Sequence, residues 1–451
     1  MTPPRIQPGL PEAEFHHTGT KPFGPPPITQ INDTGLSRLF LQDLALKIFY
    51  FQGYLTGYEV AEKISLPYTA IVDIIVDSLK KEKFVEVKAS TMGLGEGSYQ
   101  YGITQAGINR AREALDRSQY AGPAPVPLED YNKAIRRQSL GKLNVSPRAL
   151  RSYLSDLILS EDIINRVGPA INSGTSVFIY GPPGNGKTSI ARAIGSMILR
   201  ESIYIPYAIF IEGQVVKLYD SVNHEIIPEL GVSETGGGTG QLKTGMRRDP
   251  RWIRIKRPFI VVGGELTLTD LDLVFNPVTK FYEAPFQLKA AGGLLLIDDF
   301  GRQQVRPTDL LNRWIIPLEN QIDFLTLHTG RKVEVPFNEL IVFSTNLPPR
   351  DLVDEAFLRR LRHKIRVGDP SFDEYRSIFK SVAESKNIPF NEESLAYLIK
   401  NWYITPNRNL RGSHPREICN QILDISTFLG CKPEMTRELL DQAADAFFVD
   451  L

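Results

Sequence analysis

Cysteine is almost absent from this chain of 451 residues, and the sequence lacks both net charge and a long apolar run. The two cysteines, Cys419 and Cys431, have no metal-ligand spacing and are too few for a disulfide framework, which favours a reducing cytosol. Lysine plus arginine (52) equals aspartate plus glutamate (52), so no overall field attracts nucleic acid or an anionic membrane. Without an apolar stretch of about 18 residues or a basic leader, we expect a cytoplasmic chain that does not span a membrane.

The chain is too long for one core, since single cores stop growing near roughly 250 to 300 residues, and it predicts several domains. Residues 1–34 are rich in proline and predict a disordered tail. Residues 35–120 contain the helical patterns "LSRLFLQDLALKIFYFQG" and "TGYEVAEKISL", the second with Thr56 as N-cap, then a glycine-broken hairpin and a closing helix. This order resembles a winged helix-turn-helix domain, an α+β fold. Proline-rich residues 121–142 predict a linker.

Residues 143–368 alternate apolar strands with helices, which predicts an α/β fold whose parallel sheet carries helices on both faces. Within them, residues from about 228 to 293 are interpreted as an insertion between the second core strand and the next. Residues 369–451 are helical throughout and predict an all-helical C-terminal domain.

The segment "SVFIYGPPGNGKTSIARAIG" places a strand, a glycine-rich turn and a helix in order, and it fits GxxxxGK[ST]. Such a turn wraps backbone N–H groups around phosphate oxygens, while the helix points its positive end at the same charge. We expect Lys187 to reach the outer phosphates of ATP and the Thr188 hydroxyl to bind Mg²⁺. The predicted nucleotide-binding residues are Gly181, Pro182, Pro183, Gly184, Asn185, Gly186, Lys187, Thr188 and Ser189.

The stretch "LLLIDDF" ends an apolar strand on two carboxylates, and we expect this strand beside the one that precedes the glycine-rich turn. Asp298 is then placed to bind Mg²⁺. In P-loop families that hydrolyse ATP with a glutamate at the next position, that residue polarises the attacking water. Asp299 stands there in this chain, with a side chain about 1.5 Å shorter. Hydrolysis with Asp299 as a catalytic carboxylate is predicted, and a hydrogen bond to the magnesium shell or a helix N-cap stays an alternative.

Three later segments follow in order: "VPFNELIVFSTNLPPRD", "DEAFLRRLRHKI" and "GSHPREICNQIL". Together with the earlier motifs they resemble the AAA+ ATPases over residues 143–451, and the helical C-terminal domain then corresponds to the family's lid. The resemblance implies that Asn346 is sensor 1 and Arg416 sensor 2. It also implies that Arg360, or as second choice Arg359, is an arginine finger acting on a neighbouring subunit, although "LRRLR" also fits a solvated basic face. A finger in trans requires a homo-oligomer, for which we expect a hexamer.

The AAA+ branch stays open. Two strands around the turn "HTGR", before the Asn346 strand, resemble the hairpin of MoxR-like proteins. The paired aspartates of "LLLIDDF" instead resemble replication initiators and helicase or transposase loaders.

The charge pattern leaves two classes of client. Residues 243–257 hold seven basic side chains and one acidic, with Trp252 among them, which fits a phosphate backbone and a stacked base, or equally a solvated loop or subunit contact. The predicted recognition helix of the N-terminal domain carries Asp73 and Asp77 and no basic residue before Lys80, so docking to protein is at least as strongly indicated as DNA binding.

The sequence therefore predicts a cytoplasmic, oligomeric AAA+ ATPase that uses ATP and Mg²⁺ to remodel or regulate a macromolecular client, most readily a protein. A DNA-associated loader or regulator and a slowly hydrolysing nucleotide switch remain as alternatives.

Overall fold

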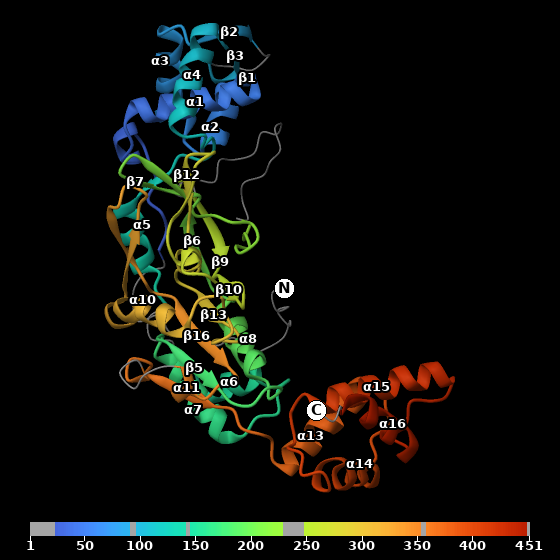
Figure 1. The fold of residues 1–451 in the computed structure, drawn as a ribbon. Coiled ribbons are helices and arrows are strands. Elements are labelled where there is room, and N and C mark those ends of the chain that lie inside the picture. Colours follow the sequence, from blue (N-terminus) through green and yellow to red (C-terminus); the bar gives the residue numbers. More distant parts are fainter. Residues whose placement is uncertain (1–22, 91–95, 141–144, 229–247, 353–357, 449–451) are drawn as a thin grey trace.

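The computed structural model describes residues 23–90, 96–140, 145–228, 248–352 and 358–448. Figure 1 shows an elongated molecule with a small N-terminal unit at one end and a parallel sheet toward the other. A helical C-terminal unit projects to one side of that sheet (Figure 1). Among the described helices, none has the length and apolar character needed to cross a bilayer.

The N-terminal unit packs helices against a three-stranded antiparallel sheet of order β1-β3-β2. Thr56 caps the second helix, as predicted, and forms a reciprocal capping box with Glu59. The predicted hairpin corresponds to β2 and β3, and its residues 91–95 lie outside the described part of the chain. The elements are α1 (Arg38–Gln52), β1 (Tyr54–Thr56), α2 (Gly57–Ile64), η2 (Tyr68–Val72), α3 (Asp73–Lys81), β2 (Val85–Ser90), β3 (Tyr99–Ile103) and α4 (Gln105–Arg117).

The predicted linker is wrong, because residues 121–142 contain β4 (Val126–Pro127) and α5 (Leu128–Arg137). Tyr131 and Ile135 on α5 are completely buried, and β4 pairs with another strand. The prolines before α5 obscured an apolar i, i+4 spacing that places both side chains on one helix face.

Part of the predicted tail is also ordered. Phe23 packs edge-on against Trp252 with 5.8 Å between ring centroids, and Thr34 is fully buried. Burial of apolar side chains orders this segment, although its proline content predicted disorder. Residues 1–22 lie outside the described part of the chain.

A second, mixed five-stranded sheet, ordered β11-β12-β8-β7-β4, lies between the N-terminal unit and the parallel sheet (Figure 1). The pair β6-β9 and the hairpin β14-β15 accompany it, and the hairpin turns at the predicted "HTGR". The strands are β6 (Ser202–Pro206), β7 (Ala208–Ile211), β8 (Gln214–Lys217), β9 (Trp252–Lys256), β11 (Val274–Asn276), β12 (Phe281–Glu283), β14 (Ile322–Thr326) and β15 (Lys332–Pro336).

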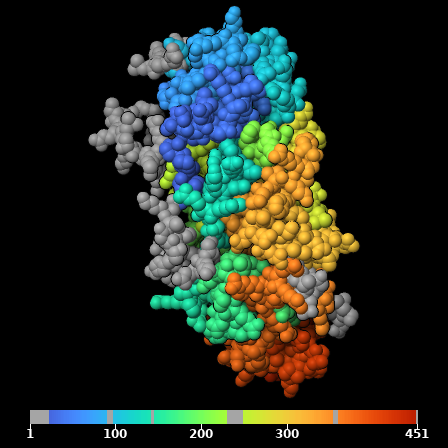
Figure 2. Space-filling model, turned by 90° about the vertical axis from the view of Figure 1, so that its left-hand side faces the viewer, coloured from blue at the N-terminus to red at the C-terminus, as the bar shows by residue number. Residues whose placement is uncertain are grey.

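The N-terminal unit and this mixed sheet share one apolar core, since Ala208 and Val215 belong to the same buried cluster as the helices of the unit. The Phe40 ring packs on the Phe210 ring at 4.8 Å. On the face shown in Figure 2, the blue atoms of the N-terminal unit adjoin the teal and green segments below them without a gap.

The parallel sheet has the order β10-β13-β16-β5-β17, and every neighbouring pair is parallel. Its apolar side chains alternate between two buried clusters, one with α6, α7 and α8 and the other with α10, so helices cover both faces as predicted. The strands are β10 (Phe259–Val262), β13 (Leu294–Ile297), β16 (Leu340–Thr345), β5 (Val177–Tyr180) and β17 (His363–Arg366). The helices are α6 (Pro147–Tyr153), α7 (Glu161–Asn172), α8 (Lys187–Ile198), α9 (Phe286–Lys289), α10 (Pro307–Asn320) and α11 (Pro349–Leu352).

Two details of the predicted sheet are wrong. The strand Phe259–Val262 belongs to the parallel sheet, so residues 228–293 do not form a single insertion. The strand that ends before Asp298 is not beside β5, because β16 lies between them. Parallel strands are joined by crossovers, so chain order does not fix which strands are neighbours.

The C-terminal unit is entirely helical in its described part, as predicted. Its core includes the fully buried Tyr375, Phe379 and Leu398. The elements are α13 (Phe372–Ser385), α14 (Glu392–Ile399), η5 (Lys400–Ile404), α15 (His414–Leu429) and α16 (Arg437–Phe447).

Candidate functional site

The glycine-rich turn between β5 and α8 depends on its glycines. Gly181, Gly184 and Gly186 have φ values of 146°, 78° and 84°, in a region that favours glycine. A Cβ on Gly181 would lie 2.0 Å from the Val367 carbonyl oxygen, so no side chain fits there. The α8 helix begins at Lys187, directly after the turn, and its positive end is available to an anion.

Lys187, Thr188 and Asp298 come together at the C-terminal edge of the parallel sheet. Lys187 is 6% exposed, and its Nζ donates to the Pro182 carbonyl oxygen at 2.8 Å. The Thr188 hydroxyl donates to the Asp298 carboxylate, with both oxygens at 3.0 Å. Burial lowers the pKa of Lys187, and the nearby Asp299 and Asp298 carboxylates partly oppose that shift.

Asp299 and Asn346 also meet at this edge. The Asn346 Nδ2 donates to Asp299 Oδ1 at 3.1 Å. The Asp299 backbone has φ 50°, and its amide donates to Asp298 Oδ1 at 3.1 Å. Asn346, which directly follows β16, therefore places its side-chain amide beside the Asp299 carboxylate, which follows β13.

The C-terminal unit closes the other side of a cleft of about 420 Å³ over the glycine-rich turn. Arg416 of α15 lines this cleft together with Lys187 and Asp299, so three separately predicted residues share one cavity. Ile158, Leu159, Ile378 and Val382 give the cleft an apolar part. The sequence did not indicate this apolar part, because isolated apolar residues outside a motif do not point to a binding site.

Asn185 joins the turn to the C-terminal unit. Its Nδ2 donates to Asp369 Oδ1 at 2.7 Å, and its Oδ1 accepts from the Gly412 amide at 3.0 Å. Arg411 pairs with the same Asp369 carboxylate. We name Asn185, Asp369, Arg411 and Gly412 the clasp. The motif predicts Asn185 as a nucleotide-binding residue of the turn, and no pattern in the sequence indicates these distant partners.

The two predicted finger arginines lie elsewhere. Arg360 pairs with Glu319 of α10, with 2.5 Å between Nε and Oε1, and Arg359 is exposed. Neither lines the cleft of its own chain. An action on a neighbouring copy stays a prediction.

The interpretation of residues 243–257 as a nucleic-acid grip is wrong for its central part. Arg251 is 2% exposed, pairs with Asp249 at 2.8 Å and donates to the backbone oxygens of Thr34 and Pro125. Trp252 is buried in the core beside Phe23, so its ring has no free face for a base. Five positions of the stretch, 243–247, lie outside the described residues.

The donor set at the turn fits Mg²⁺, since a hydroxyl and a carboxylate are the hard oxygen ligands that this ion takes. Thr188 and Asp298 already stand within hydrogen-bond distance. Within the described ranges, no group of three or more His, Cys, Asp and Glu side chains could hold a metal.

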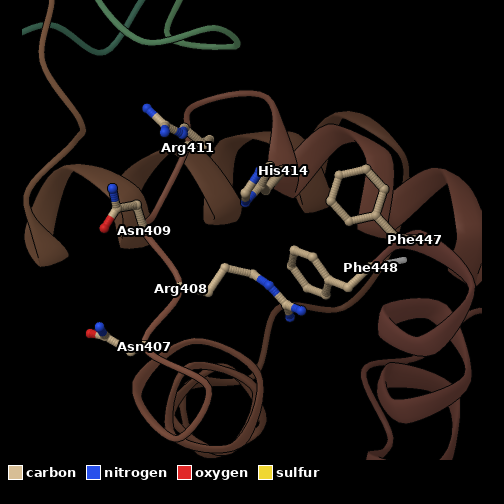
Figure 3. A pocket seen from close by; sticks show the side chains of 7 residues that line it. All are labelled: Asn407, Arg408, Asn409, Arg411, His414, Phe447 and Phe448. Carbon is tan, nitrogen blue, oxygen red and sulfur yellow. The ribbon is translucent and has the colours of Figure 1, made fainter. Parts of the chain in front are cut away.

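A second hollow, of about 370 Å³, lies on the C-terminal unit. Figure 3 shows Arg408 reaching toward the Phe448 ring, and its guanidinium carbon lies 4.0 Å from the ring centroid. Burial, with Arg411 and Arg408 nearby, lowers the pKa of His414 to about 4, so this imidazole is neutral at physiological pH. Arg411 lines this hollow and pairs with Asp369, and Asp369 in turn accepts from Asn185, which lines the cleft.

The fold and the site define an α/β protein with a glycine-rich turn, a Thr–Asp oxygen pair and a helical unit over the cleft.

A family described as a domain of unknown function (DUF8689) matches residues 371–446, within the C-terminal helices. A point mutant of RuvB from Thermotoga maritima is 11% identical, with 66% of this chain and 73% of that chain covered and a TM-score of 0.39. NtrX from Brucella abortus in complex with ADP is 15% identical, with 74% and 65% covered and a TM-score of 0.37. No curated protein matches the sequence. At TM-scores below 0.5 these similarities establish neither a family nor an activity.

Proposed function

We propose that the protein is an AAA+ ATPase that binds ATP with Mg²⁺ in the cleft over the glycine-rich turn and hydrolyses it. The observation that carries this proposal is the pairing of Thr188 with Asp298 at 3.0 Å, because α8 and β13 lie far apart in the chain. The order β13-β16-β5 supports it, since β16, which ends just before Asn346, stands between the other two strands, where the family resemblance requires a sensor.

In this proposal each residue of the turn has a separate task. The turn amides and the α8 N-terminus hold the phosphates, and Lys187 leaves the Pro182 carbonyl to pair with the outermost one. Thr188 and Asp298 would hold Mg²⁺, which when bound neutralises charge on the phosphate oxygens.

Asp299 and Asn346 act on the attacking water. Asn346 holds the Asp299 carboxylate through its Nδ2, and that carboxylate accepts a proton from the water. The water oxygen bonds to the terminal phosphorus as the bond to the bridging oxygen breaks, and ADP leaves. Arg416 from the opposite wall of the cleft balances the charge that spreads over the phosphoryl oxygens.

Completion of the site by a neighbour is the reason to propose a homo-oligomer, a ring of six. Arg360 lies outside its own cleft and is held by Glu319, so it is available to a site on another copy after exchanging that partner. Arg359 is the second choice for the same task.

The proposed client is a protein, bound in the cytoplasm through the winged-helix-like N-terminal unit. Asp73 and Asp77 belong to α3, the helix that would read DNA, and Arg251 and Trp252 are internal. These positions offer little to a phosphate backbone.

The test is ATP turnover and binding of a fluorescent ATP analogue by the wild type, Lys187→Ala and Lys332→Ala. Lys332 lies exposed on β15 and controls for the loss of one positive charge. We expect Lys187→Ala to lose turnover and to bind nucleotide at least about tenfold more weakly. Wild-type kinetics in Lys187→Ala would refute the proposal.

A further inference from the structure

The loop after β13 holds Asp299 in a backbone conformation that a non-glycine residue seldom adopts. Its φ is 50°, and Gly301 two residues later has φ 102°. Aspartate visits this region more readily than most side chains, but the conformation still costs free energy that local contacts must offset. The contacts that impose it therefore also decide where the carboxylate points.

The side chain of Gln303 bridges this loop from one side. Its Oε1 accepts from the Gly301 amide at 2.7 Å, and its Nε2 donates to the Asp298 carbonyl oxygen at 2.9 Å. These two backbone groups flank the Asp299–Phe300 pair. One amide side chain thus fixes both ends of the left-handed step.

The opposite side of the loop is anchored to β16. The Phe300 amide donates to the Ser344 carbonyl oxygen at 2.7 Å, and the Thr345 hydroxyl donates to the Phe300 carbonyl oxygen at 2.6 Å. Phe300 is 1% exposed and belongs to the core under α10. With Phe300 fixed in this way, two further contacts hold the loop around Asp299: the Gln303 side chain, and the Arg302 amide, which donates to the Asp299 carbonyl oxygen at 3.0 Å.

We propose that Gln303 is a positioning residue for ATP hydrolysis: it fixes the Asp298 carbonyl and the Gly301 amide so that the short Asp299 carboxylate faces Asn346. The inference rests on the proposed ATPase function and extends it to a residue outside every motif. The left-handed step brings forward a carboxylate that lacks one methylene relative to glutamate, and Gln303 maintains that step.

Gln304 provides a matched control, because it is the adjacent, exposed glutamine and the structure shows no role for its side chain at the loop. We would compare kcat, KM, affinity for a non-hydrolysable ATP analogue and melting temperature in the wild type, Gln303→Ala and Gln304→Ala. Gln303→Glu is a second variant, since its carboxylate accepts from the Gly301 amide but cannot donate to the Asp298 carbonyl oxygen.

We expect Gln303→Ala to lower kcat by about tenfold to a hundredfold, because small misplacements of a reacting group cost that much. Analogue affinity should stay within about twofold, since the phosphate contacts are untouched. The kcat of Gln303→Glu should fall as well. In the Gln303→Ala background, Asp299→Glu should recover part of the lost kcat through its longer reach.

A Gln303→Ala enzyme with the kcat of Gln304→Ala would overturn the inference, and so would a fall in analogue affinity as large as the fall in kcat. If Gln303→Ala fails to fold, Gln303→Glu and its kcat decide the matter. Wild-type turnover no faster than that of Lys187→Ala would refute the ATPase function and this inference together, so the two failures are distinguishable.

Discussion

At the residue scale, the main question is whether the second carboxylate after β13 takes part in chemistry. Asp299 faces Asn346 at 3.1 Å and lines the cleft, which favours a catalytic task. Its alternatives make different predictions for rate and binding, so a single substitution separates them.

We expect Asp299→Asn to lower ATP turnover by about a hundredfold or more while analogue binding persists, because a general base of this kind contributes that much. Steady-state turnover and fluorescence titration give both quantities. Asp445→Asn, an exposed change of the same type on α16, is the control. Equal, very slow turnover in the wild type and in Asp299→Asn would favour the nucleotide switch.

The neutral His414 predicts a pH effect on stability. Its pKa in the fold is about 4, below the unfolded value of about 6.5, so the unfolded chain binds more protons between these values. The free energy of unfolding should therefore fall as pH drops from about 6.5 to 4. In His414→Phe, whose ring suits the surrounding aromatic residues, urea titrations across this window should show a shallower decline. An unchanged slope would contradict the assignment.

At the element scale, the clasp is the direct tie between the glycine-rich turn and α15. Asn185→Ala removes two hydrogen bonds and leaves the Gly412 amide without its side-chain acceptor, which should cost about 1 to 3 kcal/mol locally. Hydrogen exchange at the first turn of α15 should accelerate relative to the exposed control Asn401→Ala. Unchanged protection there would show that other contacts hold the C-terminal unit.

Elements with a clean periodicity were predictable from the sequence. The capped helix at Thr56, the strands before Asp298 and Asn346 and the C-terminal helices all lie where the pattern placed them. The helix Leu128–Arg137 was missed because preceding prolines outweighed ten residues of helical spacing. The place of β10 was missed because neighbours in a parallel sheet are chosen by packing across crossovers.

The same limit applies to the candidate site. Lys187, Thr188 and Asp298 could be named because a short motif fixes their spacing around a phosphate. Gln303 and Asp369 could not, because their roles depend on a left-handed loop and on a contact between residues far apart in the chain. Trp252 shows the opposite error, since its basic neighbours indicated a surface while its ring is in the core.

At the scale of the whole molecule, assembly is the property to test. We expect Arg360→Ala to reduce turnover by about a thousandfold, as removal of an arginine finger does. Mixing it with inactive Lys187→Ala subunits should restore part of the activity, because each defect lies in a different copy of a shared site. Glu319→Gln removes the resting partner of Arg360 and controls for loss of the ion pair. No recovery on mixing would argue against completion in trans.

The continuous packing from Phe40 of the N-terminal unit to Phe210 of the mixed sheet has a mechanical consequence. A flexible linker would let a client bound to the N-terminal unit take many positions around the rest of the molecule. The shared apolar core instead holds the N-terminal unit in one orientation. A client bound at the N-terminal end would stay at a fixed distance from the cleft. A small rotation of the mixed sheet would give a larger displacement at that end, because the molecule is elongated. The protein would then bind its client at one distance from the cleft and in one orientation.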